Sequence, residues 1–286
     1  MNIAITAATG KVGSATLAAA QARNLPIRAL VRDAARLSVP ASSIIAFDFA
    51  DRATHARALE GVDTLVLISP STPEQVQQVS AVIDSARAAG VGHVIKLSGT
   101  GAEQGGNRFA EQHRAIEQHL SASGMAATIL RATFFMENAL GIARAIASGI
   151  YPAPTADARM GQIAIADIAA VVLAVISEPA GHRGAIYTLT GPAAYTGEEM
   201  ASAFSEATRR PVRYVDVPES AFRQSLLDAG LDGFTVAGLI EAYGLVRAGG
   251  TAATTDHVFR VTGRSPIDFA GWARSHAQAF LESGAA

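Results

Sequence analysis

A glycine pair after the first apolar run of the chain has the clearest chemistry. Residues Asn2 to Thr6 lead into Ala7-Ala8-Thr9-Gly10-Lys11-Val12-Gly13, and a helical stretch follows. At a helix N-terminus the unpaired backbone N–H groups and the positive end of the helix dipole favour an anion, and glycine lets the backbone come close to it. The order of strand, glycine turn and helix is that of a turn that binds a dinucleotide pyrophosphate. We therefore expect the cofactor to contact Ala7, Thr9, Gly10, Lys11 and Val12.

Ala7 stands where the usual motif has its first glycine. Alanine fits such a turn only if its φ stays negative, so it either weakens binding or shifts the backbone slightly. The alternative is that the whole turn is only a tight connection between strand and helix and binds no ligand. The place of the turn after the first of several strands favours binding.

The end of the second apolar run selects between the two nicotinamide dinucleotides. A carboxylate there binds the ribose hydroxyls of NAD, whereas an arginine accommodates the 2′-phosphate of NADP. Arg32 holds this position, and its planar guanidinium can grip a phosphate through paired hydrogen bonds. NADP(H) is therefore favoured over NAD(H). Asp33 follows directly, and it either accepts a ribose hydroxyl or caps the next turn.

His113 and Glu117 stand four residues apart in a later helical stretch, so they share one helix face. Because the ordinary pKa of histidine is near neutrality, His113 is expected to supply a proton or to orient an acceptor. The alternative is a surface pair of His113 with Glu117. Ser98, at the end of the fifth apolar run, either hydrogen-bonds the acceptor or caps its strand.

Spacing excludes two other chemistries. His113 and His119 are six residues apart and face different sides of a helix, and the chain has no cysteine, so no metal site is expected. Ser98 lacks the glycine two residues before it that a nucleophile elbow needs, which makes a hydrolase improbable.

Short apolar runs alternate with helical stretches over the first 131 residues. The expected strands are Ile3 to Thr6, Ile27 to Val31, Ile44 to Phe47, Thr64 to Ile68, His93 to Leu97 and Ala127 to Leu130. The expected helices are Lys11 to Arg23, Arg52 to Leu59, Pro73 to Ala89, with Thr72 as its N-cap, and Arg108 to Ser123. This alternation predicts an α/β fold with a Rossmann-type doubly wound parallel sheet, whose ligand binds at the carboxyl ends of the strands.

Beyond about residue 135 the alternation loosens. We expect two strands, Ala185 to Leu189 and Val212 to Asp216, and a final helix near Asp268 to Glu282. Residues 1–150 are expected to form the NAD(P)-binding domain, with strands returning from the later half. Residues 151–286 are expected to form a smaller, mostly helical, substrate-binding cap over the ligand crevice.

Composition argues against polyanionic partners. The net charge is −2, and the densest basic cluster, Arg209, Arg210 and Arg213, is too small for nucleic acid or an anionic membrane. The longest apolar stretch, Ile163 to Ile176, has about 14 residues and predicts a buried helix, since a membrane span needs roughly 20. Without a signal stretch before the first strand, we expect a cytoplasmic protein. The oligomeric state stays open, a homodimer included.

Further motifs resemble the NmrA-like branch of the atypical short-chain dehydrogenase/reductases. They are Thr6 to Gly13, Leu30-Val31-Arg32, Asp48-Phe49, Leu97-Ser98-Gly99 and Leu130 to Asn138. Within that branch the chain is most similar, over nearly its whole length, to the NAD(P)H:quinone oxidoreductase and triphenylmethane reductase group. The resemblance implies that Asp48 and Phe49 flank the adenine. It also implies that Ser69, Pro70 and Ser71 lie beside the ribose on the nicotinamide side, and Thr133, Phe134 and Phe135 beside the nicotinamide.

Carbonyl-reducing members of the wider family use a tyrosine with a lysine four residues later. No tyrosine of this chain has a lysine at that spacing, and the only lysines are Lys11 and Lys96. A quinone or similar conjugated acceptor takes a hydride directly, so that positioning is the main catalytic contribution. The sequence therefore predicts an NAD(P)H-dependent reductase of a small-molecule acceptor. The alternative is an NmrA-like redox sensor that holds NAD(P) without turnover.

Overall fold

The computed structural model describes residues 1–282 and divides into two units. Unit 1 contains Met1–Ala132 and Ile165–Thr188; unit 2 contains Thr133–Ala164 and the chain from Leu189 onward. The division thus falls at Thr133 instead of residue 150, because the chain leaves the unit 1 sheet after its sixth strand. Ile165–Thr188 then returns to unit 1.

Unit 1 is built on a seven-stranded sheet with the order β10-β6-β5-β4-β1-β2-β3. The strands are β1 (Ile3–Ile5), β2 (Ile27–Val31), β3 (Ser43–Ala46), β4 (Thr64–Leu67), β5 (His93–Gly99), β6 (Ala127–Ala132) and β10 (Ile186–Leu189). All neighbours from β3 to β6 pair in parallel, with Ile3 lying between Ile27 and Thr64. The predicted Rossmann-type sheet is confirmed.

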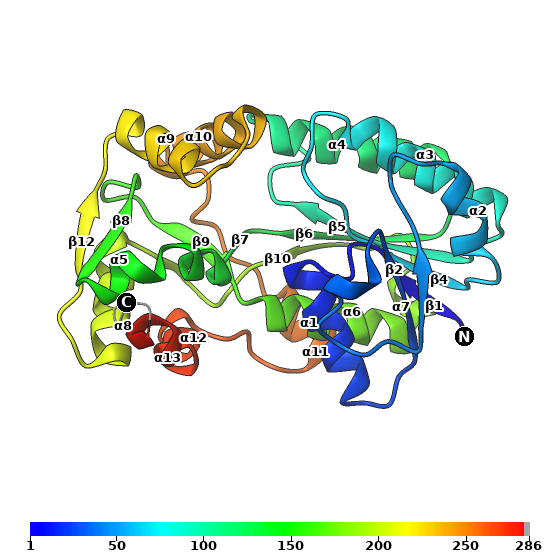
Figure 1. Cartoon of the computed structure of the whole chain (residues 1–286), viewed down its shortest axis with the longest axis horizontal. Helices are drawn as coiled ribbons and strands as arrows, with labels where there is room; N and C mark the ends of the chain where they lie inside the picture. Colours follow the sequence, from blue (N-terminus) through cyan, green and yellow to red (C-terminus); the bar gives the residue numbers. More distant parts are fainter. Residues whose placement is uncertain (283–286) are drawn as a thin grey trace. The chain divides into compact units, whose positions relative to one another are not determined.

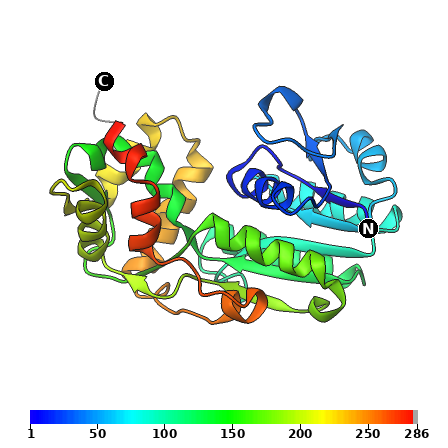
Figure 2. The ribbon, with the colours of Figure 1, turned by 90° about the horizontal axis from the view of Figure 1, so that it is seen from below.

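Helices cover both faces of this sheet (Figure 1). One layer contains α2 (Ala53–Leu59), α3 (Gln75–Ala88) and α4 (Arg108–Ala122); the other contains α1 (Lys11–Gln21), α6 (Ile165–Ser177) and α7 (Pro179–His182). Figure 2 shows α6, in green, along the sheet beside α1. Val79, Val82 and Ile83 of α3 are fully buried in one core with Leu65 and Val94 of the strands.

The start of α3 differs from the prediction. The helix begins at Gln75, and Glu74 occupies the N-cap position, so the prediction of Thr72 as N-cap is wrong. A preceding turn, in which the Gln75 N–H donates to the Thr72 carbonyl at 3.1 Å, delays the helix. The same carbonyl accepts a hydrogen bond from the Gln112 side chain of α4 at 2.7 Å.

Unit 2 contains two small sheets and several short helices. The three-stranded sheet has the order β11-β9-β7, with β7 (Phe134–Phe135), β9 (Met160–Ile163) and β11 (Ala194–Tyr195); the other pairs β12 (Arg213–Asp216) with β8 (Ile150–Ala153). The helices are η2 (Met136–Ile142), α5 (Ala143–Ala147), α8 (Gly197–Thr208), α9 (Glu219–Asp228), α10 (Gly233–Arg247), α11 (His257–Thr262), α12 (Phe269–Ser275) and α13 (Ala277–Glu282). Phe204, Phe269, Trp272 and Phe280 form the centre of its core.

Two expectations for the second half need adjustment. The final helix is interrupted at His276, which separates α12 from α13. The short strands β7, β8, β9 and β11 were not predicted, because two to four residues are too few for an alternating pattern.

The apolar stretch Ile163 to Ile176 forms the buried helix α6, as predicted. Within residues 1–282, no helix combines the length and hydropathy needed to cross a membrane.

Candidate cofactor and active site

The turn between β1 and α1 has the geometry of an anion cradle. The Gly10 N–H donates to the Ala7 carbonyl at 2.9 Å, and Gly10 is the N-cap of α1. A Cβ on Gly13 would overlap the Ala7 carbonyl, so only glycine lets α1 pack this close to the turn. The condition given for alanine in this turn, a negative φ, is not met at Ala7, whose φ is +48°. Ala7 holds a left-handed conformation because the chain must reverse sharply into the helix.

A cavity of about 670 Å³ opens beside this turn in unit 1. Its volume is within the range of small-molecule and cofactor sites. The predicted cofactor residues that line it are Ala7, Thr9, Gly10, Arg32, Asp48, Phe49 and Pro70. Residues from the ends of β1 and β2, and from the loops after β3 and β4, therefore surround one space that fits a dinucleotide.

Other predicted residues lie elsewhere. Val12 is buried in α1, and neither Lys11 nor Ser71 is among the residues that line this cavity. The Ser69 hydroxyl accepts a hydrogen bond from Gln75 at 2.9 Å. Thr133, Phe134 and Phe135 belong to unit 2.

Two arginines stand at one end of the cavity. Arg32 and Arg36 both line it and are exposed. Asp33 caps the turn after β2, since its Oδ1 accepts the Ala35 N–H at 3.0 Å. Sequence reasoning missed Arg36, although its place four residues after Arg32 was a usable signal.

The loop after β3, which carries Asp48 and Phe49, is held from behind by a buried histidine. The His55 Nε2 lies 3.0 Å from the Asp48 carbonyl oxygen, and its ring stacks on Phe47 with centroids 5.1 Å apart. Phe47 in turn meets the Phe49 ring edge-on at 5.1 Å. The side chain of Asp48 accepts the Ala50 N–H at 3.0 Å. This packing fixes the wall predicted to meet the adenine.

Ser98, at the end of β5, lies in a buried polar cluster with α4 and β6. Its hydroxyl donates to Glu117 Oε1 at 2.6 Å. Arg131 holds the same carboxylate through Nε at 3.1 Å and Nη2 at 2.6 Å, and its Nη1 contacts Glu103 at 2.8 Å. Glu117 therefore does not form a surface pair with His113. It is a buried anion that positions the Ser98 hydroxyl.

His113 packs its ring against the backbone at the end of β5. A Cβ on Gly99 would lie 2.9 Å from the His113 Cδ2, and the His113 Nδ1 is buried without a hydrogen-bond partner among the described residues. Burial lowers the pKa of His113 to about 3, and the positive charge of Lys96 acts in the same direction. The imidazole is therefore neutral at pH 7. The expectation that His113 supplies a proton is therefore wrong, because that would need an imidazolium. The other expectation, that His113 orients the acceptor, stays open for a neutral ring.

Sequence reasoning missed Lys96, as it missed Arg131 and Glu103 of the same cluster. Lys96 has no exposed surface, although it carries an amine. Its Nζ donates to the Leu97 carbonyl. Burial lowers the pKa of Lys96 to about 8, while the charge of Glu117 acts to raise it. The signal was a lysine between two apolar residues of a strand, Ile95 and Leu97.

In unit 2, Thr133 and Phe134 have well-defined partners. The buried Thr133 hydroxyl donates to the Gly161 carbonyl at 2.9 Å. The rings of Phe134 and Tyr243 have centroids 5.5 Å apart, and Tyr243 meets Phe222 edge-on at 4.9 Å. A cavity of about 240 Å³ lies beside the last two rings, and its lining is Pro154, Pro218, Glu219, Phe222, Ile240, Tyr243, Gly244 and Arg247.

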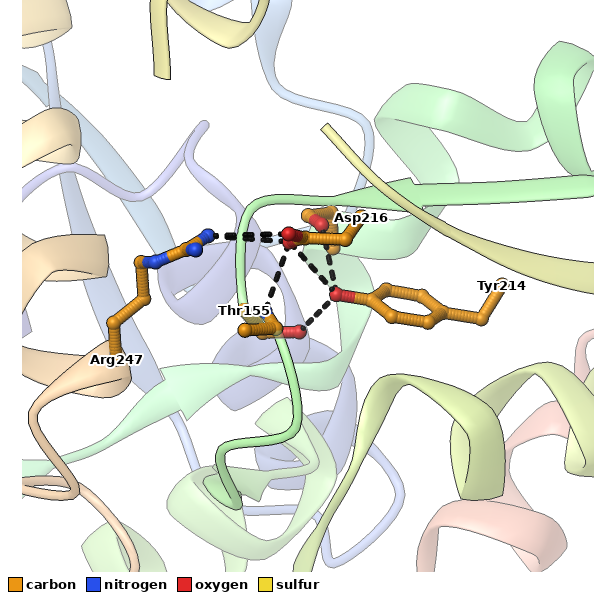
Figure 3. Close-up of polar contacts among 6 residues, drawn as sticks. Thr155, Tyr214, Asp216 and Arg247 are labelled. Carbon is orange, nitrogen blue, oxygen red and sulfur yellow. Dashed lines mark hydrogen bonds and ion pairs between the residues drawn. The ribbon is translucent and has the colours of Figure 1, made fainter. Parts of the chain in front are cut away.

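A polar network fixes the arginine of that cavity (Figure 3). Asp216 Oδ1 accepts hydrogen bonds from the Ala156 N–H at 2.8 Å, the Tyr214 hydroxyl at 3.1 Å and Arg247 Nη1 at 3.2 Å. The Thr155 and Tyr214 hydroxyls are 2.9 Å apart. Asp216 thereby joins β12 to the end of α10.

Within residues 1–282, no three histidine or acidic side chains come together in a way that could hold a metal ion.

Comparison with known proteins places the chain in a family. Residues 1–251 match the NmrA-like family. The chain is 36% identical over 287 aligned residues to the NAD(P)H azoreductase of Xenophilus azovorans, covering 97% of this chain and 99% of the relative. It is 33% identical over 237 residues to quinone oxidoreductase 2 of Escherichia coli, covering 80% and 82% of the two chains.

Solved structures agree with this placement. The NADPH complex of the E. coli quinone oxidoreductase superposes with a TM-score of 0.84 at 29% identity, covering 96% of this chain and 99% of that one. The NADP(H) complex of the Citrobacter triphenylmethane reductase has a TM-score of 0.85 over 96% of this chain and 100% of that one; at 22% identity it supports the fold. The chain therefore belongs to the NmrA-like family, as its motifs indicated.

Proposed function

We propose that this protein is an NADPH-dependent reductase that delivers a hydride to a quinone, an azo compound or a similar conjugated small molecule. The observation that carries the proposal is the cavity of about 670 Å³, which joins the Ala7 to Gly10 turn to Arg32 and Arg36. The turn suits a pyrophosphate, and the two guanidinium groups suit a further phosphate.

The preference for NADPH rests on the loop after β2. Asp33 lines the same cavity with one carboxylate oxygen engaged by the Ala35 N–H, and two arginines stand beside it there. Arg32 and Arg36 remain as ligands for the 2′-phosphate. The related quinone oxidoreductase was solved with NADPH.

Bound NADPH would supply the hydride. The chain's own residues would orient the acceptor: Ser98 is fixed by Glu117, and His113 presents a neutral ring. Neither residue is a strong acid at pH 7, which suits an acceptor whose reduced form takes its proton from water.

Unit 2 would supply the acceptor-binding surface. Its cavity of about 240 Å³ is lined by Phe222, Tyr243, Ile240 and two prolines, so it favours a flat apolar ring. Tyr243 also touches Phe134, a residue that the family resemblance puts beside the nicotinamide.

The sensor alternative has less support. The relatives named above are an azoreductase and a quinone oxidoreductase. A third relative, 32% identical over 285 residues, is the (4-alkanoyl-5-oxo-2,5-dihydrofuran-3-yl)methyl phosphate reductase of Streptomyces griseus.

The direct test is oxidation of NADPH, followed at the nicotinamide absorbance, with a panel of quinones, azo dyes and triphenylmethane dyes. NADH is assayed in parallel, and simple ketones serve as negative controls because the Tyr–Lys pair is absent. We expect turnover with at least one conjugated acceptor and faster turnover with NADPH than with NADH. Tight NADPH binding without turnover of any acceptor would overturn the proposal in favour of the sensor.

A further inference from the structure

The loop after β3 depends on support from outside the sheet. β3 is the end strand of the seven-stranded sheet, beside β2, and the loop that carries Asp48 and Phe49 follows it. Ser43, Ile44 and Ala46 of β3 are exposed. A segment with few buried neighbours opens easily, so the position of this loop depends on the contacts made from behind it.

This loop lies at the adenosine end of the cofactor cavity. Val31 and Ala46 are register partners at the ends of β2 and β3, so Arg32 and Asp48 follow neighbouring strand ends. Arg32, Asp48 and Phe49 all line the cavity of about 670 Å³. The 2′-phosphate that suits Arg32 belongs to the adenosine ribose of NADPH. The adenine base would therefore lie within reach of the same wall.

His55, in the first turn of α2, contacts this wall from behind. It has no exposed surface and is not among the residues that line the cavity. Its Nε2 lies 3.0 Å from the Asp48 carbonyl oxygen, and because a carbonyl can only accept, Nε2 carries the hydrogen. Its Nδ1 lies 3.3 Å from the Ser85 hydroxyl oxygen of α3. The ring therefore ties the Asp48 backbone to two helices.

Stacked rings extend this support from His55 to Phe49. The rings of His55 and Phe47 are stacked with centroids 5.1 Å apart, and Phe47 meets Phe49 edge-on at the same distance. Phe47 is buried, whereas Phe49 lines the cavity. A hydrogen bond to the Asp48 backbone and a contact through Phe47 thus act on the two residues of the loop that would meet the base.

We propose that His55 is a positioning residue for the adenine half of the cofactor, which acts on NADPH affinity through Asp48 and Phe49 without touching the ligand. This inference rests on the proposed function. A wall that is already held in its bound conformation loses less conformational entropy when the ligand arrives, so it binds the ligand more tightly. The effect should be equal for NADPH and NADH, since both carry adenine, and it should not reach the hydride transfer.

The test is a titration with adenosine 2′,5′-bisphosphate, which carries the adenine and the 2′-phosphate but no nicotinamide. His55→Met and His55→Gln introduce side chains of similar length, but only glutamine can donate to the Asp48 carbonyl. We expect His55→Met to weaken binding of the bisphosphate, NADPH and NADH by the same factor of about tenfold, and His55→Gln to stay within about threefold of wild type. The kcat at saturating NADPH should not change.

His93→Met is the matched control. His93 is also buried, with its Nε2 2.9 Å from the Thr128 hydroxyl, but it begins β5 and so lies at the end of the strands opposite to the cavity. Its substitution should lower the Tm without changing the affinity for the bisphosphate. The inference is overturned if His55→Met binds the bisphosphate as tightly as wild type, or if His93→Met or His55→Gln loses as much affinity as His55→Met.

A second measurement follows the histidine rings of the wild-type protein. On saturation with the bisphosphate, the ring 15N signals of His55 should shift and those of His93 should stay, and His55→Gln and His93→Met assign the two sets. Unmoved His55 signals would also overturn the inference. Binding of the bisphosphate without turnover of any acceptor would overturn the proposed reductase and leave the role of His55 standing, whereas a wild type that does not bind the bisphosphate would overturn both.

Discussion

Ala7 is a residue whose backbone conformation conflicts with its side chain. Its φ of +48° costs an L-residue about 1–2 kcal/mol relative to the right-handed region, and glycine avoids this cost. We expect Ala7→Gly to raise the free energy of unfolding by about 1 kcal/mol, measured by urea denaturation, since the larger chain entropy of glycine offsets part of the gain. Ala156, with the same φ of +48° in unit 2, is the matched control. Ala156→Gly should give a similar gain without altering NADPH affinity. If neither substitution raises the free energy of unfolding, the strain argument is contradicted.

Arg32 is expected to discriminate between the cofactors. Arg32→Ala should weaken NADPH binding about tenfold or more and NADH binding less than twofold, because only NADPH has the 2′-phosphate. Titration of the protein with each cofactor measures both affinities. Asp33→Ala, which removes the cap on Ala35 but no positive charge, should not weaken NADPH binding more than NADH binding. Equal weakening by Arg32→Ala would refute the assigned contact.

At the scale of elements, the close approach of α1 to the Ala7–Ala8 turn depends on Gly13. Alanine normally stabilises a helix relative to glycine by up to about 1 kcal/mol, but a Cβ at Gly13 would overlap the Ala7 carbonyl. We expect Gly13→Ala to destabilise the protein by at least about 2 kcal/mol and to weaken NADPH binding. Gly244 of α10 has open space around its Cα, so Gly244→Ala should stabilise instead. Thermal unfolding of both variants tests this prediction. If the Tm shifts in the same direction in both variants, the packing at Gly13 is not tight.

The elements were predictable where their signals are local. The strands β1, β2 and β4 were found because buried parallel strands are continuous apolar runs, and Ile27–Val31 is matched to the residue. The phosphate turn and Arg32 follow from fixed places next to such strands. The φ of Ala7, the burial of Lys96 and the Ser98–Glu117–Arg131 contacts could not be predicted, since they depend on β5, β6 and α4 coming together across the chain. The two-residue strands of unit 2 are too short to show any alternation of apolar and polar residues.

For the whole molecule, buried His113 makes stability depend on pH. Its pKa is lowered from 6.5 to about 3, so between these values the unfolded chain binds a proton that the folded protein does not. Stability is therefore lost as the pH falls below 6.5, by about 2 to 3 kcal/mol from this residue between pH 6.5 and 4.5.

Urea denaturation of wild type and His113→Gln at the two pH values isolates this contribution. The variant should lose less stability on acidification, whereas the carboxylates with lowered pKa values, Glu199, Asp216 and Asp232, act equally in both proteins. Identical losses would show that His113 is protonated in the folded state.

The path of the chain has a consequence for fragments and chimaeras. Unit 1 needs Ile165–Thr188 as well as Met1–Ala132, so a protein truncated at residue 150 would lack α6, which packs on α1, and β10, which borders β6. Such a truncation would leave a hydrogen-bonding edge and an apolar face open to self-association. To exchange unit 2 between relatives, recombination must therefore occur at three crossovers, after Ala132, Ala164 and Thr188, with the two grafted pieces taken from one parent.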